Sequence, residues 1–142
     1  MDKIVFITGA SSGIGAGCAR KFASQGASLI LNARNVNKLS ALKEELEKQY
    51  GAKIYLLPFD VRDRKAATSA LESLPKEWQS IDILVNNAGL VIGTDKEQEG
   101  SLDEWDIVID TNIKALLAMT RLIVPGMVER KRGHIINIGS IA

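Results

Sequence analysis

Two kinds of segment alternate along this 142-residue chain, and their alternation constrains the fold more than any other feature of the sequence. Short apolar runs rich in Ile and Val are typical of fully buried strands, and they cover residues 3–8, 28–32, 53–58, 81–86 and 134–139. Stretches with helical spacing lie between them, at residues 13–24, 36–50, 64–74, 102–109 and 112–130. Parallel neighbours require crossover connections, which helices provide, so the order predicts an α/β fold with helices on both faces of a parallel sheet.

Glycine and proline residues mark the predicted helix boundaries. Gly26 and Gly51 follow the first two helical stretches, where a glycine commonly caps a helix. Pro125 lies inside the last stretch, so we expect that helix to kink there or to consist of two pieces. The polar, glycine-bounded stretch 91–100 is predicted to be a loop over one edge of the site. The apolar residues near one stripe of the last helix are expected mainly to pack against the sheet, and they are Met119, Leu122, Ile123 and Met127.

The charge balance excludes several classes of partner. Eighteen basic residues against seventeen acidic ones leave a net charge of +1, too small to favour nucleic acid or an anionic membrane. No apolar stretch approaches the ~20 residues of a membrane span. Cys18, the single cysteine, is interpreted as a small core residue in a reducing compartment, with a reactive thiol as the alternative. We therefore expect one domain over residues 1–142, located in the cytoplasm.

The segment TGASSGIG, residues 8–15, follows the first predicted strand and opens the first predicted helix. Its glycines, Gly9, Gly13 and Gly15, allow a tight turn, a close backbone approach and close packing of the helix. Unpaired N–H groups and the positive end of the helix dipole can then face a phosphate. No Gly-Lys-Ser/Thr sequence is present, which argues against a P-loop nucleotidase. Taken alone, the segment is also compatible with a purely structural turn.

Four further motifs, in the right order and on the right elements, make the chain resemble the short-chain dehydrogenase/reductase family. They are FDV with Asp60 after the third strand, NNAG at residues 86–89, DTNIKA with Asn112 opening the long helix, and INIGS with Ser140 ending the fifth strand. The resemblance covers the whole chain. It implies a Rossmann-type doubly wound parallel sheet that is truncated after the fifth strand.

The resemblance also implies which residues contact the cofactor. The assigned positions are Gly9, Ser11, Gly13 and Ile14 for the pyrophosphate and nearby ribose, Asp60 and Val61 for adenine, Asn87, Ala88 and Gly89 for the ribose next to nicotinamide, and in addition Ser12 and Asn35. Asp60 has a structural alternative as a cap at the end of the strand, and both roles can coexist. Asn86 is expected to brace the sheet.

The end of the second strand indicates which cofactor the chain takes. Members of the family that are specific for NAD carry an acidic residue there for the ribose 2′-hydroxyl, whereas this chain has Ala33 followed by Arg34. An arginine can hold a 2′-phosphate with two hydrogen bonds, and a carboxylate would repel it. The sequence therefore favours NADP(H), with a solvated loop residue as the alternative interpretation of Arg34.

The family moves a hydride between nicotinamide and a carbinol or carbonyl carbon, and four side chains assist it. A tyrosine acts as acid and base, a lysine lowers the pKa of that tyrosine, a serine orients the substrate oxygen, and an asparagine supports a proton relay. The resemblance assigns the last two roles to Ser140 and Asn112. The Tyr-x-x-x-Lys pair has no counterpart, because Tyr50 and Tyr55 flank the entry to the third strand. We therefore expect the sequence to be the N-terminal portion of a longer polypeptide and to be inactive alone.

Within the family, the stretches SLPKEW, IDILVNNAGL and PGMVERKRGHIINIGS look like those of NADP-dependent serine and 3-hydroxy acid dehydrogenases. This likeness implies a small hydroxy or oxo substrate. The alternative is a noncatalytic, NADP(H)-binding or regulatory protein. The family usually assembles as a dimer or tetramer, so the stretch 112–130 is a candidate interface. No histidine or cysteine cluster indicates a metal site.

Overall fold

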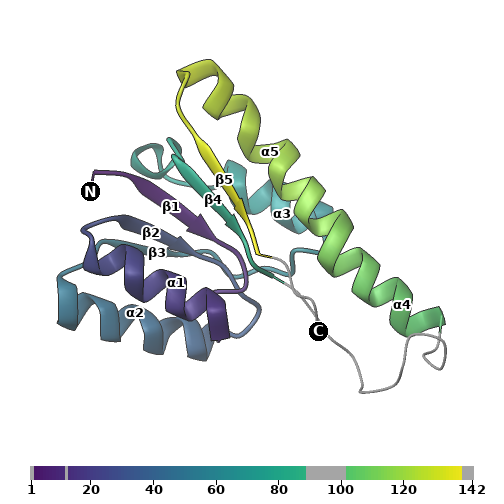
Figure 1. Ribbon diagram of the computed structural model, residues 1–142, viewed down its shortest axis with the longest axis horizontal. Coiled ribbons are helices and arrows are strands. Elements are labelled where there is room, and N and C mark those ends of the chain that lie inside the picture. Colours follow the sequence, from purple (N-terminus) through teal and green to yellow (C-terminus); the bar gives the residue numbers. More distant parts are fainter. Residues whose placement is uncertain (1, 12, 89–101, 139–142) are drawn as a thin grey trace.

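The computed structural model describes residues 2–11, 13–88 and 102–138, and in this part of the chain a parallel sheet lies between two layers of helices (Figure 1). The strands are β1 (Ile4–Ile7), β2 (Ser28–Leu31), β3 (Ile54–Leu56), β4 (Ile83–Asn86) and β5 (His134–Asn137). The helices are α1 (Gly13–Ser24), α2 (Val36–Tyr50), α3 (Arg64–Glu72), α4 (Leu102–Ile109) and α5 (Ala115–Arg130). A short 3-10 turn, Lys76–Trp78, precedes β4.

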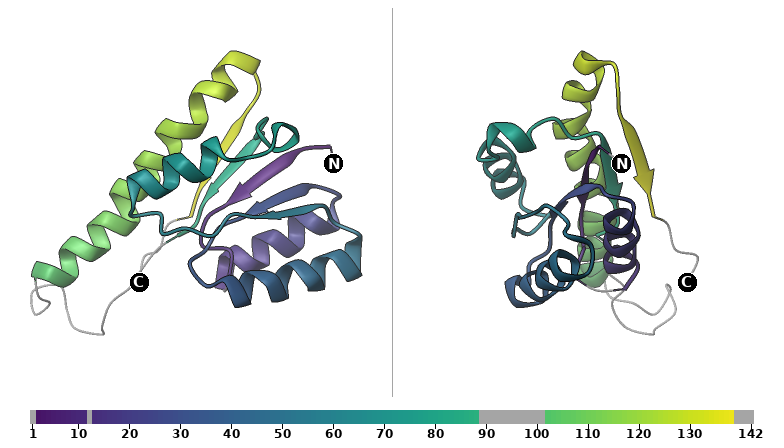
Figure 2. Two further views of the ribbon diagram at one scale, coloured as in Figure 1. Left: turned by 180° about the vertical axis from the view of Figure 1, so that it is seen from behind. Right: turned by 90° about the vertical axis from the view of Figure 1, so that its left-hand side faces the viewer.

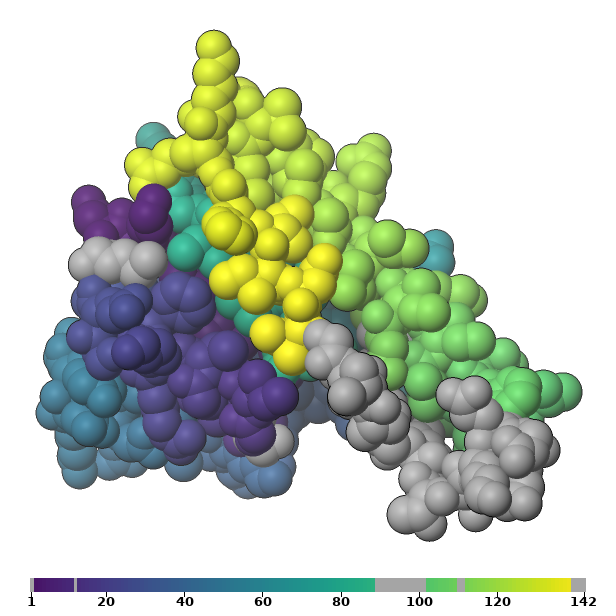
Figure 3. Space-filling view, viewed as in Figure 1, coloured from purple at the N-terminus to yellow at the C-terminus, as the bar shows by residue number. Residues whose placement is uncertain are grey.

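The five described strands are hydrogen-bonded in the order β3-β2-β1-β4-β5, and every neighbouring pair is parallel. The predicted doubly wound α/β fold is therefore confirmed. In the register of the sheet, Ile7 pairs with Leu31 on one side and with Val85 on the other. The strand order reverses between β1 and β4. Among the described strands β5 is an edge, and it lies open at the surface between α1 and α5 (Figure 3).

Helices cover both faces of the sheet, which explains why the strands are apolar at most positions; the exceptions are Ser28, Asn86, His134 and Asn137. Along β1, Val5 and Ile7 face one core and Phe6 faces the other. Helices α1 and α2 cover the first face, and α3 and α5 cover the second (Figure 2). Successive side chains of a strand point to opposite faces, so a single run of apolar residues supplies both cores.

The boundaries of α1 and α2 follow from their capping residues. Gly26 and Gly51 adopt left-handed conformations with φ of +84° and +63°, which confirms the two predicted glycine caps. A residue without a Cβ adopts this conformation without strain. At the other end of α2, Asn35 is the N-cap, and its Oδ1 accepts a hydrogen bond from the backbone N–H of Lys38 at 3.1 Å. The loop exit from β2 therefore leads directly into a well-defined helix start.

The long helix differs from the prediction at its start, and it is not divided into two pieces at its proline. The stretch 112–130 does not begin a separate helix, because a π-helical turn, Asp110–Lys114, joins α4 directly to α5. Asn112 therefore lies inside a continuous helical segment, and π turns of this kind occur frequently at functional sites. Pro125 does not divide α5, which continues to Arg130. Met119, Ile123 and Met127 are buried on both sides of that proline, so packing against the sheet outweighs the lost hydrogen bond; Leu122 is exposed.

Candidate functional site

The predicted site residues gather at the carboxyl ends of the strands, around the point where the strand order reverses. Two short segments leave the sheet there: residues 8–11 follow β1, and residues 87–88 follow β4. We call these two segments the switch-point loops. In open parallel sheets, ligands bind outside the carboxyl ends of the strands at such a reversal. Helix α1 begins beside these loops and carries the chain back across the sheet (Figure 1).

Thr8 holds the switch-point loops together. Its buried hydroxyl accepts hydrogen bonds from the backbone N–H groups of Asn87 at 3.0 Å and Ala88 at 2.9 Å, and donates to the carbonyl of Val85 at 3.4 Å. The Asn87 side chain in turn donates to the carbonyl of Gly9 at 3.0 Å. The sequence analysis missed this role of Thr8. The signal was its position as the polar residue that ends an apolar strand.

The three glycines of the turn differ in what a side chain at their position would meet. Gly9 has φ of +60°, and a Cβ there would lie 2.9 Å from the Cα of Ala88. A Cβ on Gly15 would collide with the carbonyl oxygen of Gly9 and with the Asn87 side chain, so only glycine lets α1 approach this closely. Gly13 has φ of +59°, and the space around its Cβ position is open. Gly9 and Gly15 therefore let the loop after β1, residues 87–88 and the start of α1 pack closely, while nothing lies within 4 Å of the Cβ position of Gly13.

The first turn of α1 is suited to an anion. Its residues include no acidic side chain, and its leading N–H groups have no intrahelical acceptors. The helix dipole adds positive potential at the same place. Gly13 and Ile14, the first two residues of the helix, are both exposed, Ile14 at 62%. The arrangement fits a phosphate group bound by backbone N–H donors.

Two arginines lie beside Asp60: Arg34, which follows β2, and Arg62, which follows β3. Ala33 is buried, whereas the Arg34 side chain is exposed, with its Nη1 4.0 Å from Oδ2 of Asp60. Asp60 also accepts hydrogen bonds from the backbone N–H and the guanidinium of Arg62. These bonds from Arg62 lower the pKa of the Asp60 carboxyl, outweighing the effect of burial, and Arg34 adds a smaller contribution in the same direction.

Buried Asn32 positions the segment that carries Asp60. Its side-chain amide donates to the carbonyls of Leu57 and Phe59, each at 3.1 Å, and so ties the exit of β3 to the end of β2. Val61 is buried next to this segment. The sequence analysis treated Asn32 only as the last residue of a strand. Its polarity within an apolar run was the signal that could have indicated a bracing role.

Asn86 braces the sheet as predicted. Its side-chain amide donates to Oδ1 of Asn137 at 3.0 Å and to the hydroxyl of Thr120 at 3.2 Å, and so joins β4 to β5 and to α5. Asn112 is half-buried in the π turn at the start of the same helical segment.

The structure thus brings several predicted residues together and leaves others undescribed. Those gathered along this edge of the sheet are Gly9, Ser11, Gly13, Ile14, Arg34, Asn35, Asp60, Val61, Asn87 and Ala88. Ser12, Gly89 and Ser140 lie outside the described residues, as does the loop predicted at 91–100.

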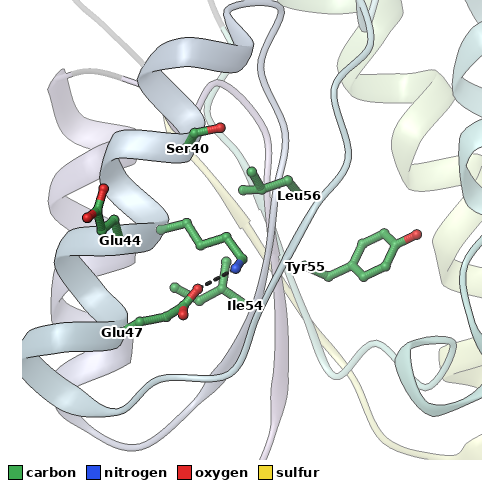
Figure 4. A pocket seen from close by; sticks show the side chains of 7 residues that line it. Ser40, Glu44, Glu47, Ile54, Tyr55 and Leu56 are labelled. Carbon is green, nitrogen blue, oxygen red and sulfur yellow. Dashed lines mark ion pairs between the residues drawn. The ribbon is translucent and has the colours of Figure 1, made fainter.

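A hollow elsewhere on the surface does not belong to this site. It lies between α2 and β3, and it is lined by Ser40, Lys43, Glu44, Glu47, Ile54, Tyr55 and Leu56 (Figure 4). None of the predicted cofactor-binding residues contributes to it. Lys43 and Glu47, one turn apart on α2, form an ion pair on one side of it, and the Tyr55 ring points away from α2 and lies tilted against Trp78.

Over residues 2–11, 13–88 and 102–138, no group of three or more His, Cys, Asp or Glu side chains is placed to hold a metal ion. Over the same ranges, no helix has the length and apolar character that crossing a bilayer requires.

Comparisons with known proteins agree with this geometry. A family model for short chain dehydrogenases matches residues 3–142. The NADP-dependent 3-hydroxy acid dehydrogenase YdfG of Escherichia coli strain K12 is 49% identical over 139 residues, which are 98% of this chain and 54% of that relative. The chain therefore spans about half the length of the curated relatives it matches.

Solved structures give the same result. The crystal structure of serine dehydrogenase from Escherichia coli has a TM-score of 0.89 at 49% identity, over 96% of this chain and 62% of that one. The closed form of a serine dehydrogenase complexed with NADP+ has a TM-score of 0.87 at 47% identity, over 97% of this chain and 54% of the other.

Proposed function

Because this chain belongs to the short chain dehydrogenase family, we propose that it forms the cofactor-binding part of an oxidoreductase that uses NADP(H). The observation that carries the proposal is the joining of the switch-point loops beside the start of α1. Thr8 and Asn87 fix the two loops to each other, and Gly15 lets the helix pack against them. The result is a preformed anion site at the reversal of strand order, where nucleotide cofactors bind in folds of this kind.

In this proposal the cofactor lies along the carboxyl edge of the sheet. Gly9, Ser11, Ser12, Gly13 and Ile14 hold its pyrophosphate and nearby ribose. The remaining contacts are Asp60 and Val61 at adenine, Arg34 and Asn35 at the 2′-phosphate side, and Asn87, Ala88 and Gly89 at the ribose next to nicotinamide. When bound, NADP(H) supplies or accepts the hydride. The relatives described as NADP-dependent or complexed with NADP+ support the choice of cofactor.

The electrostatics at the end of β2 support NADP(H) over NAD(H). An acidic residue at this place accepts the 2′-hydroxyl of NAD(H), and Ala33 cannot do so. The guanidinium of Arg34 is exposed and offers a planar set of N–H donors that matches a phosphate. Asn35 caps α2 through its Oδ1 and can offer a phosphate only the neutral donor Nδ2, so we assign the dominant contact to the charged guanidinium of Arg34.

For the reaction, we propose that Ser140 orients the substrate oxygen and that Asn112 supports a proton relay. A developing alkoxide needs fixed hydrogen-bond donors, and a serine hydroxyl that follows β5 in the sequence is suited to that purpose. The acid and base of the family is a tyrosine next to a lysine. No Tyr-x-x-x-Lys pattern occurs in these 142 residues, so the proposal assigns the acid and base to none of them.

We propose a small 3-hydroxy acid such as serine, or the corresponding oxo compound, as the substrate. The likeness to relatives named as 3-hydroxy acid and serine dehydrogenases supports this choice. A noncatalytic NADP(H)-binding protein is the second candidate, favoured by the absence of the Tyr-x-x-x-Lys pattern. Sequencing the reading frame that follows codon 142 distinguishes the two candidate functions. A Tyr-x-x-x-Lys pattern there supports the enzyme, and a stop codon supports the noncatalytic binding protein.

Calorimetric titration with NADPH and NADH tests the choice of cofactor. We expect Arg34→Ala to weaken NADPH binding by about 1.5–3 kcal/mol, the usual value of hydrogen bonds to a charged group, and to change NADH binding little. Lys38→Ala, which removes an exposed cation one turn into α2, is the matched control and should leave both affinities unchanged. Equal losses for NADPH and NADH in the Arg34 variant would refute the assignment.

A further inference from the structure

The carboxylate of Asp60 lies between two guanidinium groups that hold it very unequally. Its Oδ2 is 2.7 Å from Nη2 of Arg62 and 4.0 Å from Nη1 of Arg34. Nε of Arg62 donates to both carboxylate oxygens, at 3.1 Å and 3.2 Å, and the backbone N–H of Arg62 donates to Oδ1 at 2.9 Å. Arg62 therefore makes the fork contact, and Arg34 makes only a long ion pair.

This carboxylate creates an electrostatic conflict at the proposed 2′-phosphate position. Asp60 and Arg34 follow neighbouring strands, and a free carboxylate there would attract the Arg34 guanidinium to itself. It would also repel an incoming dianionic phosphate, as an acidic residue does at the corresponding ribose in NAD-specific sites. The two effects act in the same direction, against a cofactor with a 2′-phosphate.

We propose that Arg62 is a positioning residue for cofactor selectivity: its fork holds the Asp60 carboxylate, so that Arg34 stays available for the 2′-phosphate of NADP(H). The inference rests on the proposed use of NADP(H) and adds a residue that does not itself touch the cofactor.

The exposed fractions of Arg62, Asp60 and Arg34 agree with a closely held carboxylate and an available Arg34. Arg62 and Asp60 are 31% and 32% exposed, whereas Arg34 is 65% exposed. A bidentate contact between a guanidinium and a carboxylate is stronger and more directional than a single long contact. The lowered pKa of Asp60 arises first from the side chain of Arg62, and the contribution of Arg34 comes last. The charge of Asp60 is thus compensated before any cofactor arrives.

The test compares the selectivity ratio, the Kd of NADH divided by the Kd of NADPH, in the full polypeptide that carries this sequence. Because NADH and NADPH share adenine and nicotinamide, changes at those parts cancel in the ratio. We expect Arg62→Met to lower the ratio about fivefold, the effect of an ion pair worth about 1 kcal/mol. In the Asp60→Asn background the same substitution should leave the ratio unchanged, because no carboxylate remains to be held.

Two further variants complete the design. Arg62→Gln keeps an N–H donor but no charge; it should lower the ratio as Arg62→Met does, and it serves if the methionine variant does not fold. Arg20→Met breaks a similar fork contact, with Glu45 on the surface formed by α1 and α2, and should leave the ratio unchanged.

Three outcomes would overturn the inference. Equal losses of NADH and NADPH affinity would show that Arg62 only maintains the local fold. An equal fall in the ratio with and without Asp60 would show that Arg62 acts independently of that carboxylate. A wild-type ratio near one would contradict the proposed preference for NADP(H) itself, and it is measured before any variant.

Discussion

At the scale of single residues, the charge of the Asp60 carboxylate stabilises the local fold of the site. The carboxylate accepts a backbone hydrogen bond from Arg62, which tightens the turn after β3, and it is held by the Arg62 side chain. Both interactions favour the ionised carboxylate, so the pKa of Asp60 is lower in the folded protein than in the unfolded chain. Ionisation of this residue is therefore coupled to folding.

Asp60→Asn should reveal this coupling as a pH-dependent loss of stability. A carboxyl group whose pKa is lowered by folding stabilises the protein above its unfolded pKa of about 3.9, and the stabilisation disappears as the pH falls through the folded pKa. We expect the variant to be less stable than wild type by up to about 1 kcal/mol at neutral pH, since the pair is partly solvated. The difference should shrink between about pH 5 and about pH 2. Urea unfolding at a series of pH values measures it.

The Arg62→Met background is the control for this pH dependence. Without Arg62 the largest cause of the lowered pKa is absent, so Asp60→Asn should then have a smaller effect at every pH. A stability difference that stays constant from neutral to acidic pH would contradict the coupling.

Single-residue roles were predictable where one residue carries the chemistry and not where a pair does. The bracing role of Asn86 followed from a polar side chain on a buried strand, whereas the contact of Arg34 with a 2′-phosphate stays a prediction. The contact of Thr8 with Asn87 spans 79 positions in sequence, and no local pattern indicates it. The fork of Arg62 depends on side-chain rotamers, which a residue pattern does not specify.

At the scale of elements, two of the three glycines of α1, Gly15 and Gly17, have opposite consequences. Gly15 faces the switch-point loops, and a Cβ there would strike the Gly9 carbonyl and the Asn87 side chain. Gly17, one half-turn later, is exposed and has no neighbour within 4 Å of its Cβ position. The first glycine is required by packing, whereas the second only weakens the helix.

We expect Gly17→Ala to raise the free energy of unfolding by about 0.4–1 kcal/mol, because alanine restricts the unfolded chain and favours the helix. Gly15→Ala should lower it by about 1–3 kcal/mol through overpacking and should also weaken NADPH binding. Chemical denaturation and calorimetry measure the two effects. Similar stabilities for both alanine variants would contradict the close approach of α1 to the loops.

Strands and helices were predicted well because the two signals that define them are local. The apolar runs of a sheet buried on both faces and the glycine caps of α1 and α2 are contiguous in sequence. The junction of α4 and α5 was not predicted, since Asp110, Thr111 and Asn112 favour helices weakly and resemble a break.

At the scale of the whole molecule, the helical segment from α4 through α5 extends beyond the sheet (Figure 1), and it exposes apolar side chains. Helix α4, all of whose residues are described, has no buried side chain. The exposed apolar residues of the segment are Leu102, Trp105, Ile109, Ile113, Leu117, Leu122 and Val128. An exposed apolar surface of this kind marks an interaction site.

We expect the polypeptide to form dimers or tetramers through this segment, in agreement with the interface predicted at 112–130. Leu117, which is 59% exposed, is suited to a test. Leu117→Lys should raise the dissociation constant of the assembly at least about fivefold, since placing an unpaired charge in an apolar interface costs more than about 1 kcal/mol. Val36→Lys, at an exposed apolar position of α2, is the control and should have no effect. Sedimentation that shows a monomer at all concentrations would contradict the proposal.

Binding of NADP(H) at the switch-point loops is tested most directly by titrating isotope-labelled protein with NADPH and following the amide chemical shifts. We expect saturable shifts at Gly9, Gly13 and Ile14, whose N–H groups lie at the proposed anion site. The amides of Glu44 and Leu56, beside the hollow between α2 and β3, should not shift. Shifts confined to that hollow, or unchanged amides in the glycine turn at high NADPH concentration, would contradict the proposed site.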